Sequence, residues 1–284
     1  MTVSETGQLY LCATPIGNLA DITYRAVDVL RTADVIAAED TRHTRRLLAH
    51  YDIHTPMTSY HEHNKETKGA ELIARMQAGD TVVCVSDAGL PGIADPGGDL
   101  ARRAIAAGIR VTPLPGANAA LSALICAGLP LEGFTFVGFL PRKEKKRREV
   151  LARVAAYPET LIFYEAPHRL KETLAALADG LGEERRACAA RELTKKFEEF
   201  RRTTLGELHA YYNENEPRGE FVLIVAGAEE SAGAADAAET TLMECYEAYI
   251  AKGLDKKEAM RRTAQELGIS RRDVYQAVLV GDAE

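Results

Sequence analysis

The chain has 284 residues and a formal net charge of −7, and 46% of its residues are hydrophobic. This length is enough for a full core and suggests about two domains. A net negative charge excludes a protein whose whole surface binds polyanions, so any nucleic-acid site must be a local basic patch. The five cysteines are odd in number and lie far apart, which favours a reducing compartment and a cytoplasmic protein.

Two stretches bear on targeting and membranes. Residues 1–8 are polar and lack the basic-then-apolar layout of a signal peptide. Residues 111–131 form a run of 21 uncharged residues, which is close to membrane-spanning length. Three prolines and two glycines interrupt that run, so we expect a turn beside a short buried helix and no membrane contact.

Short apolar runs alternate with helical patterns through residues 1–115, the expected first domain. Strands are expected at 8–13, 34–38, 57–60, 82–85 and 110–114. Helices are expected at 21–30, 44–50, 65–78 and 99–107. Asp21 is the expected cap of the first helix, and Asp95 and Pro96 the N-cap and first residue of the last. This alternation indicates an α/β domain with a mainly parallel sheet covered on both faces.

Residues 116–227 continue the pattern less regularly and are expected to form a second α/β domain. Strands are expected at 134–138, 160–164, 187–190, 197–203 and 220–226. Helices are expected over 117–127, from Lys143 onward and over 167–178. The less regular order of these elements predicts a mixed sheet.

The C-terminal residues differ in composition from the rest. Residues 228–241 contain few large apolar side chains and are expected to be a linker. Helices are then expected over 242–251, over 256–267 with Asp255 and Glu258 in capping-box spacing, and from a turn at 268–270 to Val280. Two helices joined by a glycine-containing turn indicate a helix-turn-helix-like module over 242–284.

Four loops that follow expected strands are rich in glycine, proline or small residues, as backbone-mediated ligand binding requires. They cover 15–18, 86–90, 115–119 and 165–169. One such loop alone is more often a tight turn without a ligand, but open α/β sheets bind ligands where several such loops meet. The glycine-rich motifs of dinucleotide and nucleoside-triphosphate sites are absent. Spacing alone therefore predicts a small-molecule cleft between two α/β halves.

Several stretches are similar to motifs of one known family. They are Ala13–Leu19 (ATPIGNL), Ala38–Arg42 (AEDTR), Ser86–Pro91 (SDAGLP), Tyr164–Arg169 (YEAPHR) and Arg191–Lys195 (RELTK). With them the chain resembles the tetrapyrrole methylase family of S-adenosylmethionine-dependent methyltransferases, from about residue 9 to residue 227. Within the family it is similar to the branch that acts on ribosomal RNA, and its terminal helices resemble a module appended in that branch.

The resemblance implies two α/β domains with S-adenosylmethionine in the cleft between them, in a homodimer. It also implies methyl transfer to the ribose 2′-oxygen of a cytidine in the decoding region of 16S rRNA, with the small ribosomal subunit as partner. The positions that match the family's cofactor contacts are Pro15, Ser86, Asp87, Leu90, Asn118, Ala119, Glu165 and Leu193. Asn118 departs from the family's usual Ser or Thr, and Glu165 stands where the porphyrin-modifying branch has an apolar residue.

Methyl transfer to a hydroxyl requires in-line alignment and a base for the released proton. Asp40, or else Glu39, is the candidate base, because both lie at a strand end where the porphyrin-modifying branch has its acidic base. The alternative for Asp40 is N-capping of the helix that follows at Thr41. The sequence leaves both interpretations open.

A short basic run is the strongest candidate for contact with RNA. Residues 142–148 hold six basic residues in seven, although the chain has a negative net charge. Such a run is most often a solvated helix face, and it is also typical of an electrostatic footprint for RNA. The side chains expected to contact RNA there are Lys145, Lys146, Arg147 and Arg148.

Five further residues are candidates for RNA contact, and each has a structural alternative. They are Arg42, His61, His168, Arg169 and Arg191. His61 and the nearby His63 can equally be solvated loop residues, and without a further His or Cys cluster we expect no metal site. His168 and Arg169 can start a helix. The two remaining arginines can form ion pairs with acidic neighbours.

Two other functions fit parts of the sequence. The first is carbon methylation of a porphyrinoid, which the basic run, the YEAPHR stretch and the appended helices disfavour. The second is a DNA-binding regulator whose first 227 residues sense a ligand. That function requires a basic recognition helix, and residues 271–275 are only mildly basic.

Overall fold

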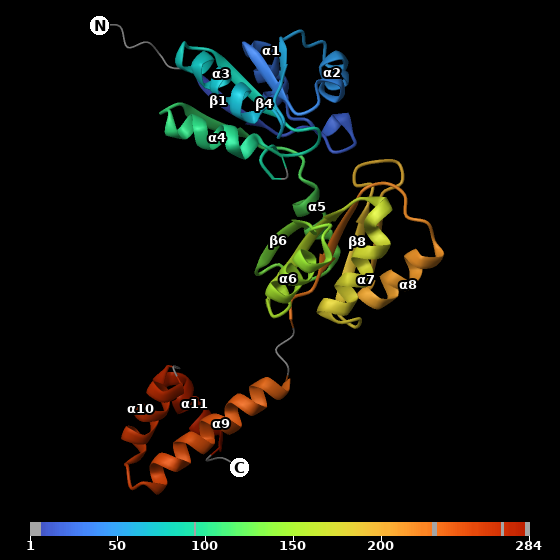
Figure 1. Cartoon of the computed structure of the whole chain (residues 1–284). Coiled ribbons are helices and arrows are strands. Elements are labelled where there is room, and N and C mark those ends of the chain that lie inside the picture. The colour runs from blue at the N-terminus through green and yellow to red at the C-terminus, as the bar shows by residue number, and fades with distance from the viewer. Residues whose placement is uncertain (1–6, 94, 229–231, 268–269, 282–284) are drawn as a thin grey trace, which may run out of the picture. The chain divides into compact units, whose positions relative to one another are not determined.

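The computed structural model describes residues 7–93, 95–228, 232–267 and 270–281 (Figure 1). The chain divides into two compact units, residues 1–227 and residues 228–284. The first unit contains two five-stranded sheets, and the second contains three helices. The stretch assessed for a signal peptide falls almost wholly outside the described residues.

The first sheet is parallel throughout and has the order β3-β2-β4-β1-β5. Its strands are β1 (Gln8–Cys12), β2 (Val35–Ala38), β3 (Met57–Ser59), β4 (Thr81–Val85) and β5 (Arg110–Leu114). Cys12 of β1, which lies between β4 and β5, stands opposite Val85 on one side and Leu114 on the other. The loops that follow β1, β4 and β5 therefore leave the sheet side by side.

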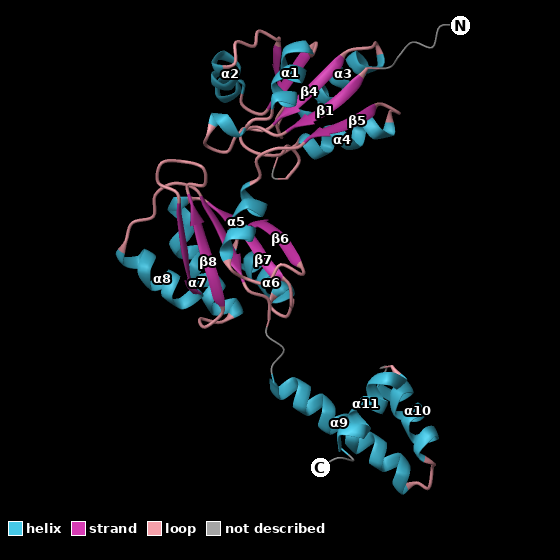
Figure 2. Cartoon of the chain, turned by 180° about the vertical axis from the view of Figure 1, so that it is seen from behind, coloured by secondary structure: helices cyan, strands magenta, loops and turns pink. Residues whose placement is uncertain are grey.

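Helices cover both faces of this sheet, as the alternating sequence pattern predicts (Figures 1 and 2). They are α1 (Tyr24–Thr32), α2 (Thr41–His50), α3 (Lys65–Gln77) and α4 (Gly97–Ala106), with a short 3-10 helix η1 (Leu19–Asp21). In β4, Val83 and Val85 pack with α1 and α2, whereas Val82 and Cys84 pack with α3 and α4. Successive side chains of a strand point to opposite faces, so a fully apolar strand requires cover on both.

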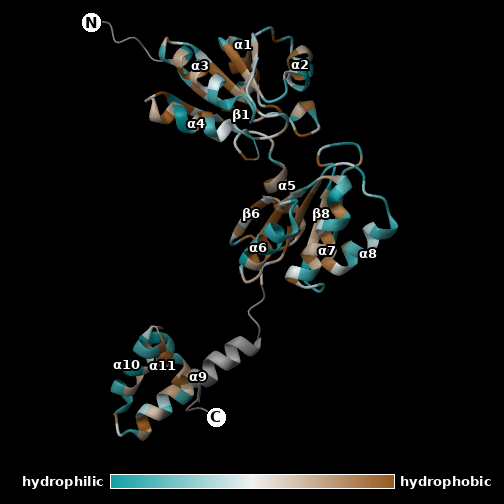
Figure 3. Cartoon of the chain, viewed as in Figure 1, coloured by the Kyte–Doolittle hydropathy of each residue, from teal (hydrophilic) through white to brown (hydrophobic). Residues whose placement is uncertain are grey.

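The second sheet is mixed, as expected, with the order β6-β7-β10-β8-β9. Its strands are β6 (Phe134–Phe139), β7 (Thr160–Glu165), β8 (Arg186–Arg191), β9 (Glu199–Thr204) and β10 (Phe221–Val225). Only the β6–β7 pair of these is parallel. The small-residue helix α5 (Ala119–Ala127) packs on one face, and α6 (Glu144–Val154), α7 (Leu170–Leu181) and α8 (Leu205–Glu214) pack on the other. The hydrophobic colouring in Figure 3 concentrates in the strands of both sheets.

Two expectations about helices in the first unit were wrong, and one further helix was not predicted. Helix α1 starts at Tyr24 because Thr23 caps it by accepting from the Ala26 amide, while Asp21 lies in the 3-10 turn before it. Helix α4 has Pro96 as its N-cap. Asp95 instead accepts hydrogen bonds from the Gly92 and Gly97 amides and so shapes the preceding loop. Helix α8 was not predicted, because tyrosine, histidine, asparagine and glycine weaken its helical pattern.

The C-terminal unit consists of α9 (Ala232–Ala251), α10 (Lys256–Leu267) and α11 (Arg271–Gly281) around a small apolar core. The expected linker over 228–241 was wrong for residues 232–241, which are helical. Alanine and glutamate form helices without large apolar side chains, so the absence of such side chains did not indicate a linker. The Glu258 amide donates to Asp255 Oδ1 at 2.8 Å, which confirms the predicted cap. The expected turn at 268–270 lies largely outside the described residues.

Within the described part of the chain, no helix is both long and apolar enough to cross a membrane.

Candidate active site

The loops after β1 and β4 are joined through their backbones. The Thr14 amide donates to the Gly89 carbonyl at 2.9 Å, and the Gly89 amide donates back to the Thr14 carbonyl at 3.0 Å. Ser86 Oγ donates to the Gly89 carbonyl at 3.1 Å. Gly89 has φ +78°, a conformation that disfavours residues with a Cβ. This glycine therefore allows the loop after β4 to meet the loop after β1.

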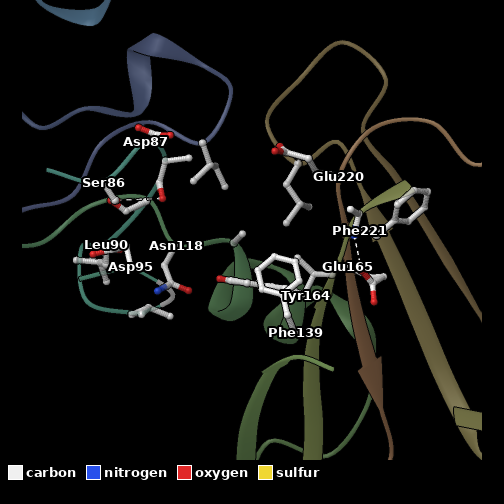
Figure 4. A pocket seen from close by; sticks show the side chains of 18 of the residues that line it. Ser86, Asp87, Leu90, Asp95, Asn118, Phe139, Tyr164, Glu165, Glu220 and Phe221 are labelled. Carbon is white, nitrogen blue, oxygen red and sulfur yellow. Dashed lines mark hydrogen bonds between the residues drawn. The ribbon is translucent and has the colours of Figure 1, made fainter. Parts of the chain in front are cut away.

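A cavity of about 360 Å³ lies where these loops face the second sheet. This volume is in the range of small-molecule sites. Seven of the eight predicted cofactor positions line it: Ser86, Asp87, Leu90, Asn118, Ala119, Glu165 and Leu193. The eighth, Pro15, is not among the lining residues, whereas its neighbour Ile16 is. Figure 4 shows the labelled residues of the two sheets on opposite sides of the cavity.

Polar side chains of the lining also hold its walls together. Asp87 Oδ1 accepts from the Asp40 amide at 2.9 Å, which ties the loop after β4 to the loop after β2. Asn118 Oδ1 accepts from the Leu121 amide at 2.9 Å and so caps α5. The Tyr164 hydroxyl accepts from the Ala120 amide at 3.2 Å and joins β7 to the same helix.

Glu165 is a buried carboxylate at the end of β7. Its Oε2 accepts from Thr173 Oγ1 at 2.6 Å, and its Oε1 accepts from the Ala166 amide at 2.8 Å. Arg169 lies 3.6 Å from Oε1 and also donates to the Leu140 carbonyl at 2.9 Å. The guanidinium of Arg169, a predicted RNA contact, is therefore used inside the protein.

The two candidate bases differ in their surroundings. Asp40 caps α2 by accepting from the Arg42 amide at 2.8 Å, and it pairs with the Arg42 guanidinium at 2.7 Å. Hydrogen bonds from Arg42 hold the pKa of Asp40 well below its usual range. Asp40 does not line the cavity, whereas Glu39 does. Burial raises the pKa of Glu39, and the charges of Asp87 and Asp95 raise it further.

The lining is acidic, because five carboxylates and one basic side chain from the described residues contribute to it. The acids are Glu39, Asp87, Asp95, Glu165 and Glu220, and the base is Lys195. Apolar side chains form much of the remaining wall, namely those of Ile16, Leu90, Ile93, Phe139, Leu193, Phe221 and Val222. The cavity therefore favours a ligand with positive charge and an apolar part.

Sequence reasoning did not assign the lining residues Ile16, Phe139, Tyr164, Lys195 and Glu220. Three of these residues stand in stretches that carried the family resemblance, so a signal was present for them. The remaining two lie at the end of β6 and just before β10, with no local motif. Their place at the cavity depends on which strands pair in the second sheet.

Helix α6 carries the basic run, and its side chains do not all face solvent. Lys145 and Lys146 are exposed and form no ion pair with another described residue. Arg148 is exposed and pairs with Glu144 at 2.6 Å. Arg147 is buried and pairs with Glu172 of α7 at 2.6 Å, so the expectation that it faces RNA was wrong.

The remaining RNA candidates do not line the cavity. Arg42 is exposed and paired with Asp40, and His168 is exposed. His61 stacks edge-on against His63 at 6.0 Å, and its buried Nδ1 has no hydrogen-bond partner among the described residues. Arg191 pairs with Glu199 at 3.3 Å. Among the described residues, no group of His, Cys, Asp and Glu side chains could hold a metal ion.

The fold places a loop-lined cavity between two α/β halves, as is typical of a small-molecule site. Residues 8–209 match the family model of the tetrapyrrole (corrin/porphyrin) methylases. The chain belongs to this family, and its chemistry is S-adenosylmethionine-dependent methyl transfer.

Two curated relatives are similar to this chain over nearly its whole length. The chain is 50% identical over 273 residues to ribosomal RNA small subunit methyltransferase I from Halalkalibacterium halodurans, with 95% of this chain and 94% of the relative covered. It is 49% identical over 277 residues to the protein of the same name from Bacillus subtilis, with coverage of 96% and 94%. Each relative is thus similar to nearly the whole chain, including its C-terminal unit.

Solved structures support the fold. A uroporphyrin-III C-methyl transferase from Thermus thermophilus, complexed with S-adenyl homocysteine, aligns with a TM-score of 0.55 and 21% identity. The alignment covers 78% of this chain and 97% of that one. This likeness shows a shared architecture and no more, because the identity is low.

Proposed function

We propose that the protein methylates the 2′-oxygen of a cytidine ribose in the decoding region of 16S rRNA, acting on the small ribosomal subunit in the cytoplasm. One observation carries this proposal. All five stretches that carried the family resemblance contribute to the cavity lining, in a chain about half identical to relatives named ribosomal RNA small subunit methyltransferase I.

The cavity lining suits S-adenosylmethionine. Its carboxylates favour the positive sulfonium and ammonium groups, and its apolar side chains favour the adenine ring. Backbone groups of the loop at 86–90 and side chains such as Leu193 and Asn118 would hold the cofactor. When bound, the cofactor supplies an electrophilic methyl group.

We assign the general base to Glu39. A base has to lie in the cavity, and Glu39 lines it while Asp40 does not. A pKa raised by burial makes Glu39 a stronger proton acceptor than an ordinary carboxylate. Asp40 binds Arg42 and caps a helix, so its role in the proposal is structural.

The cavity rim suits a nucleotide. Phe139 lines the cavity and its ring is exposed, in edge contact with Tyr164 at 5.7 Å. An exposed aromatic ring at the entrance of a site can stack with an unpaired base. Lys145 and Lys146 on α6 supply cations for the RNA backbone outside the cavity.

The test is direct. Purified protein is incubated with labelled S-adenosylmethionine and either small ribosomal subunits or a porphyrinoid, and the RNA is then digested to nucleosides. We expect label in 2′-O-methylcytidine from the subunits and none in the porphyrinoid. Label in the porphyrinoid alone, or on an RNA base, would overturn the proposal.

We also propose a homodimer. Leu121 and Ile125 of α5 and Phe134 and Phe136 of the edge strand β6 are exposed apolar side chains, which is unusual for a face that stays in water. Light scattering during size-exclusion chromatography should give twice the chain mass of 30.9 kDa. A monomer at micromolar concentration would contradict it.

A further inference from the structure

Lys195 is the one basic side chain that the described residues contribute to the cavity. Its Nζ lies 2.8 Å from Glu192 Oε1 and 2.8 Å from Glu220 Oε2. Burial acts against its charged form, but the two carboxylates raise the pKa of this ammonium. Lys195 is therefore a fixed positive charge beside a cavity whose other ionisable lining groups are acidic.

The two carboxylates that hold Lys195 are not equivalent. The Glu192 side chain is 19% exposed, also accepts from the Glu220 amide at 3.1 Å, and packs directly against Gly219, where a Cβ would collide with it. The Glu220 side chain is 76% exposed. Among the described residues, its carboxylate has one partner, Lys195. Exposed ion pairs contribute little to stability, so Glu220 can leave at small cost.

The segment that carries Lys195 is held in an unusual backbone conformation. Glu192 and Thr194 have φ values of +51° and +64°, in the left-handed region that residues other than glycine rarely adopt. The Asn18 amide donates to Thr194 Oγ1 at 3.1 Å, and a Cβ at Gly17 would lie 2.5 Å from Lys195 Cγ. Contacts with the loop of the first sheet therefore fix this segment at the cavity, and strain of this kind is typical of functional sites.

The chemistry of the acceptor requires a cation at this place. In RNA the 2′-oxygen and the 3′-phosphate belong to the same ribose, so a ribose that reaches the cavity brings a phosphodiester to its edge. Five lining carboxylates would repel that phosphate. Lysine is a common phosphate ligand and acts as a point charge.

We infer that Lys195 binds a phosphodiester of the RNA next to the methylated ribose, and that Glu220 holds its place until the RNA displaces it. This inference rests on the proposed function and names the contact that the acceptor makes at the same site. Glu192 stays bound to Lys195 throughout and keeps the ammonium directed at the rim.

The experiment compares two lysine–glutamate pairs. Lys171 and Glu216 form a pair of 2.6 Å with side chains 39% and 73% exposed, close to the 29% and 76% of Lys195 and Glu220, but neither lines the cavity. Binding to small ribosomal subunits is measured at several salt concentrations for K195M, K195R, E220Q, K171M and E216Q. Folding and cofactor binding are measured for each variant by circular dichroism and calorimetry.

We expect K195M to weaken RNA binding about tenfold and to lower the salt slope by roughly 0.7 to 0.9, the value of one lost phosphate contact. K195R should keep the slope, and E220Q should tighten binding two- to threefold because the competing carboxylate is neutral. K171M and E216Q should match the wild type.

Three results would overturn the inference while the proposed function stands. They are an unchanged salt slope in K195M, whatever its cofactor affinity, a weaker RNA affinity in E220Q, or a salt slope that falls as much in K171M as in K195M. The proposed function fails separately, if the wild-type protein binds the cofactor but places no methyl group on the ribose.

Discussion

The two sheets contribute to the cavity in different ways. The first sheet supplies loops fixed by backbone hydrogen bonds, such as the reciprocal pair between Thr14 and Gly89. The second sheet supplies side chains from strands distant in sequence, such as Tyr164 of β7 and Glu220 beside β10. The comparison suggests that the first wall depends on local sequence and the second on strand pairing and side-chain networks.

The largest expected effect comes from the base on the first wall. Replacing Glu39 with Gln should lower kcat about 100- to 10,000-fold, the usual contribution of general base catalysis, with cofactor affinity changed less than threefold. D40A should retain more than a tenth of the activity and instead lower the thermal midpoint, because it removes the side chain that caps α2. Single-turnover methylation and calorimetry measure both. Equal rates in E39Q and the wild type would refute the assignment.

The pH dependence follows from the same residue. A base acts in its deprotonated form, and burial raises the pKa of Glu39. The rate should therefore rise with pH through a midpoint above the usual glutamate value of about 4.3. In E39Q the rate should no longer rise with pH over this acidic range. If the rate of E39Q still rises with pH over this range, the titrating group is a residue other than Glu39.

Gly89 tests whether the first wall depends on its backbone. Alanine in the left-handed conformation costs about 1–2 kcal/mol, and at φ +78° a Cβ would also touch Ile16 and the Ala117 carbonyl. G89A should weaken cofactor binding about tenfold, because the loop has to shift away from the cavity. Gly108 has a similar φ of +72° with nothing within 4 Å of a Cβ and is not in the lining, so G108A is the matched control. Equal cofactor affinities in G89A and G108A would contradict the prediction, because the position of Gly89 at the cavity would then have no effect of its own.

Thr173 tests the side-chain network of the second wall. T173V removes the 2.6 Å hydrogen bond to the buried Glu165 carboxylate, which should lower the free energy of unfolding by about 1–3 kcal/mol. In T32V the lost bond is exposed, between Thr32 Oγ1 and the Asp28 carbonyl at 3.0 Å, and the change should stay below about 0.5 kcal/mol. Urea unfolding followed by circular dichroism measures both. A T173V midpoint equal to that of T32V would mean that water replaces the lost donor.

The difference between the two walls of the cavity also determines how much of the structure could be predicted from the sequence. Apolar runs such as 82–85 located the strands of the parallel sheet within a residue or two, and the small-residue loops after them located eight of the twenty residues that line the cavity. Phe139 and Glu220 could not be predicted, because they reach the cavity only through the pairing of β6, β7 and β10. The inward orientation of Arg147 also depends on tertiary packing, since it results from the approach of α7 to α6.

The smallest effect concerns the basic run on α6, outside both walls. Replacing Lys145 and Lys146 with Gln should weaken RNA binding several-fold and lower the salt slope by roughly one to two, as the loss of two phosphate contacts requires. R147Q is the matched control, because Arg147 has the same charge on the same helix but is buried against Glu172. It should leave the slope unchanged and lower the thermal midpoint instead. If R147Q changes the slope as much as the double lysine variant, the effect belongs to the net charge of the helix and not to contacts made by its exposed side chains.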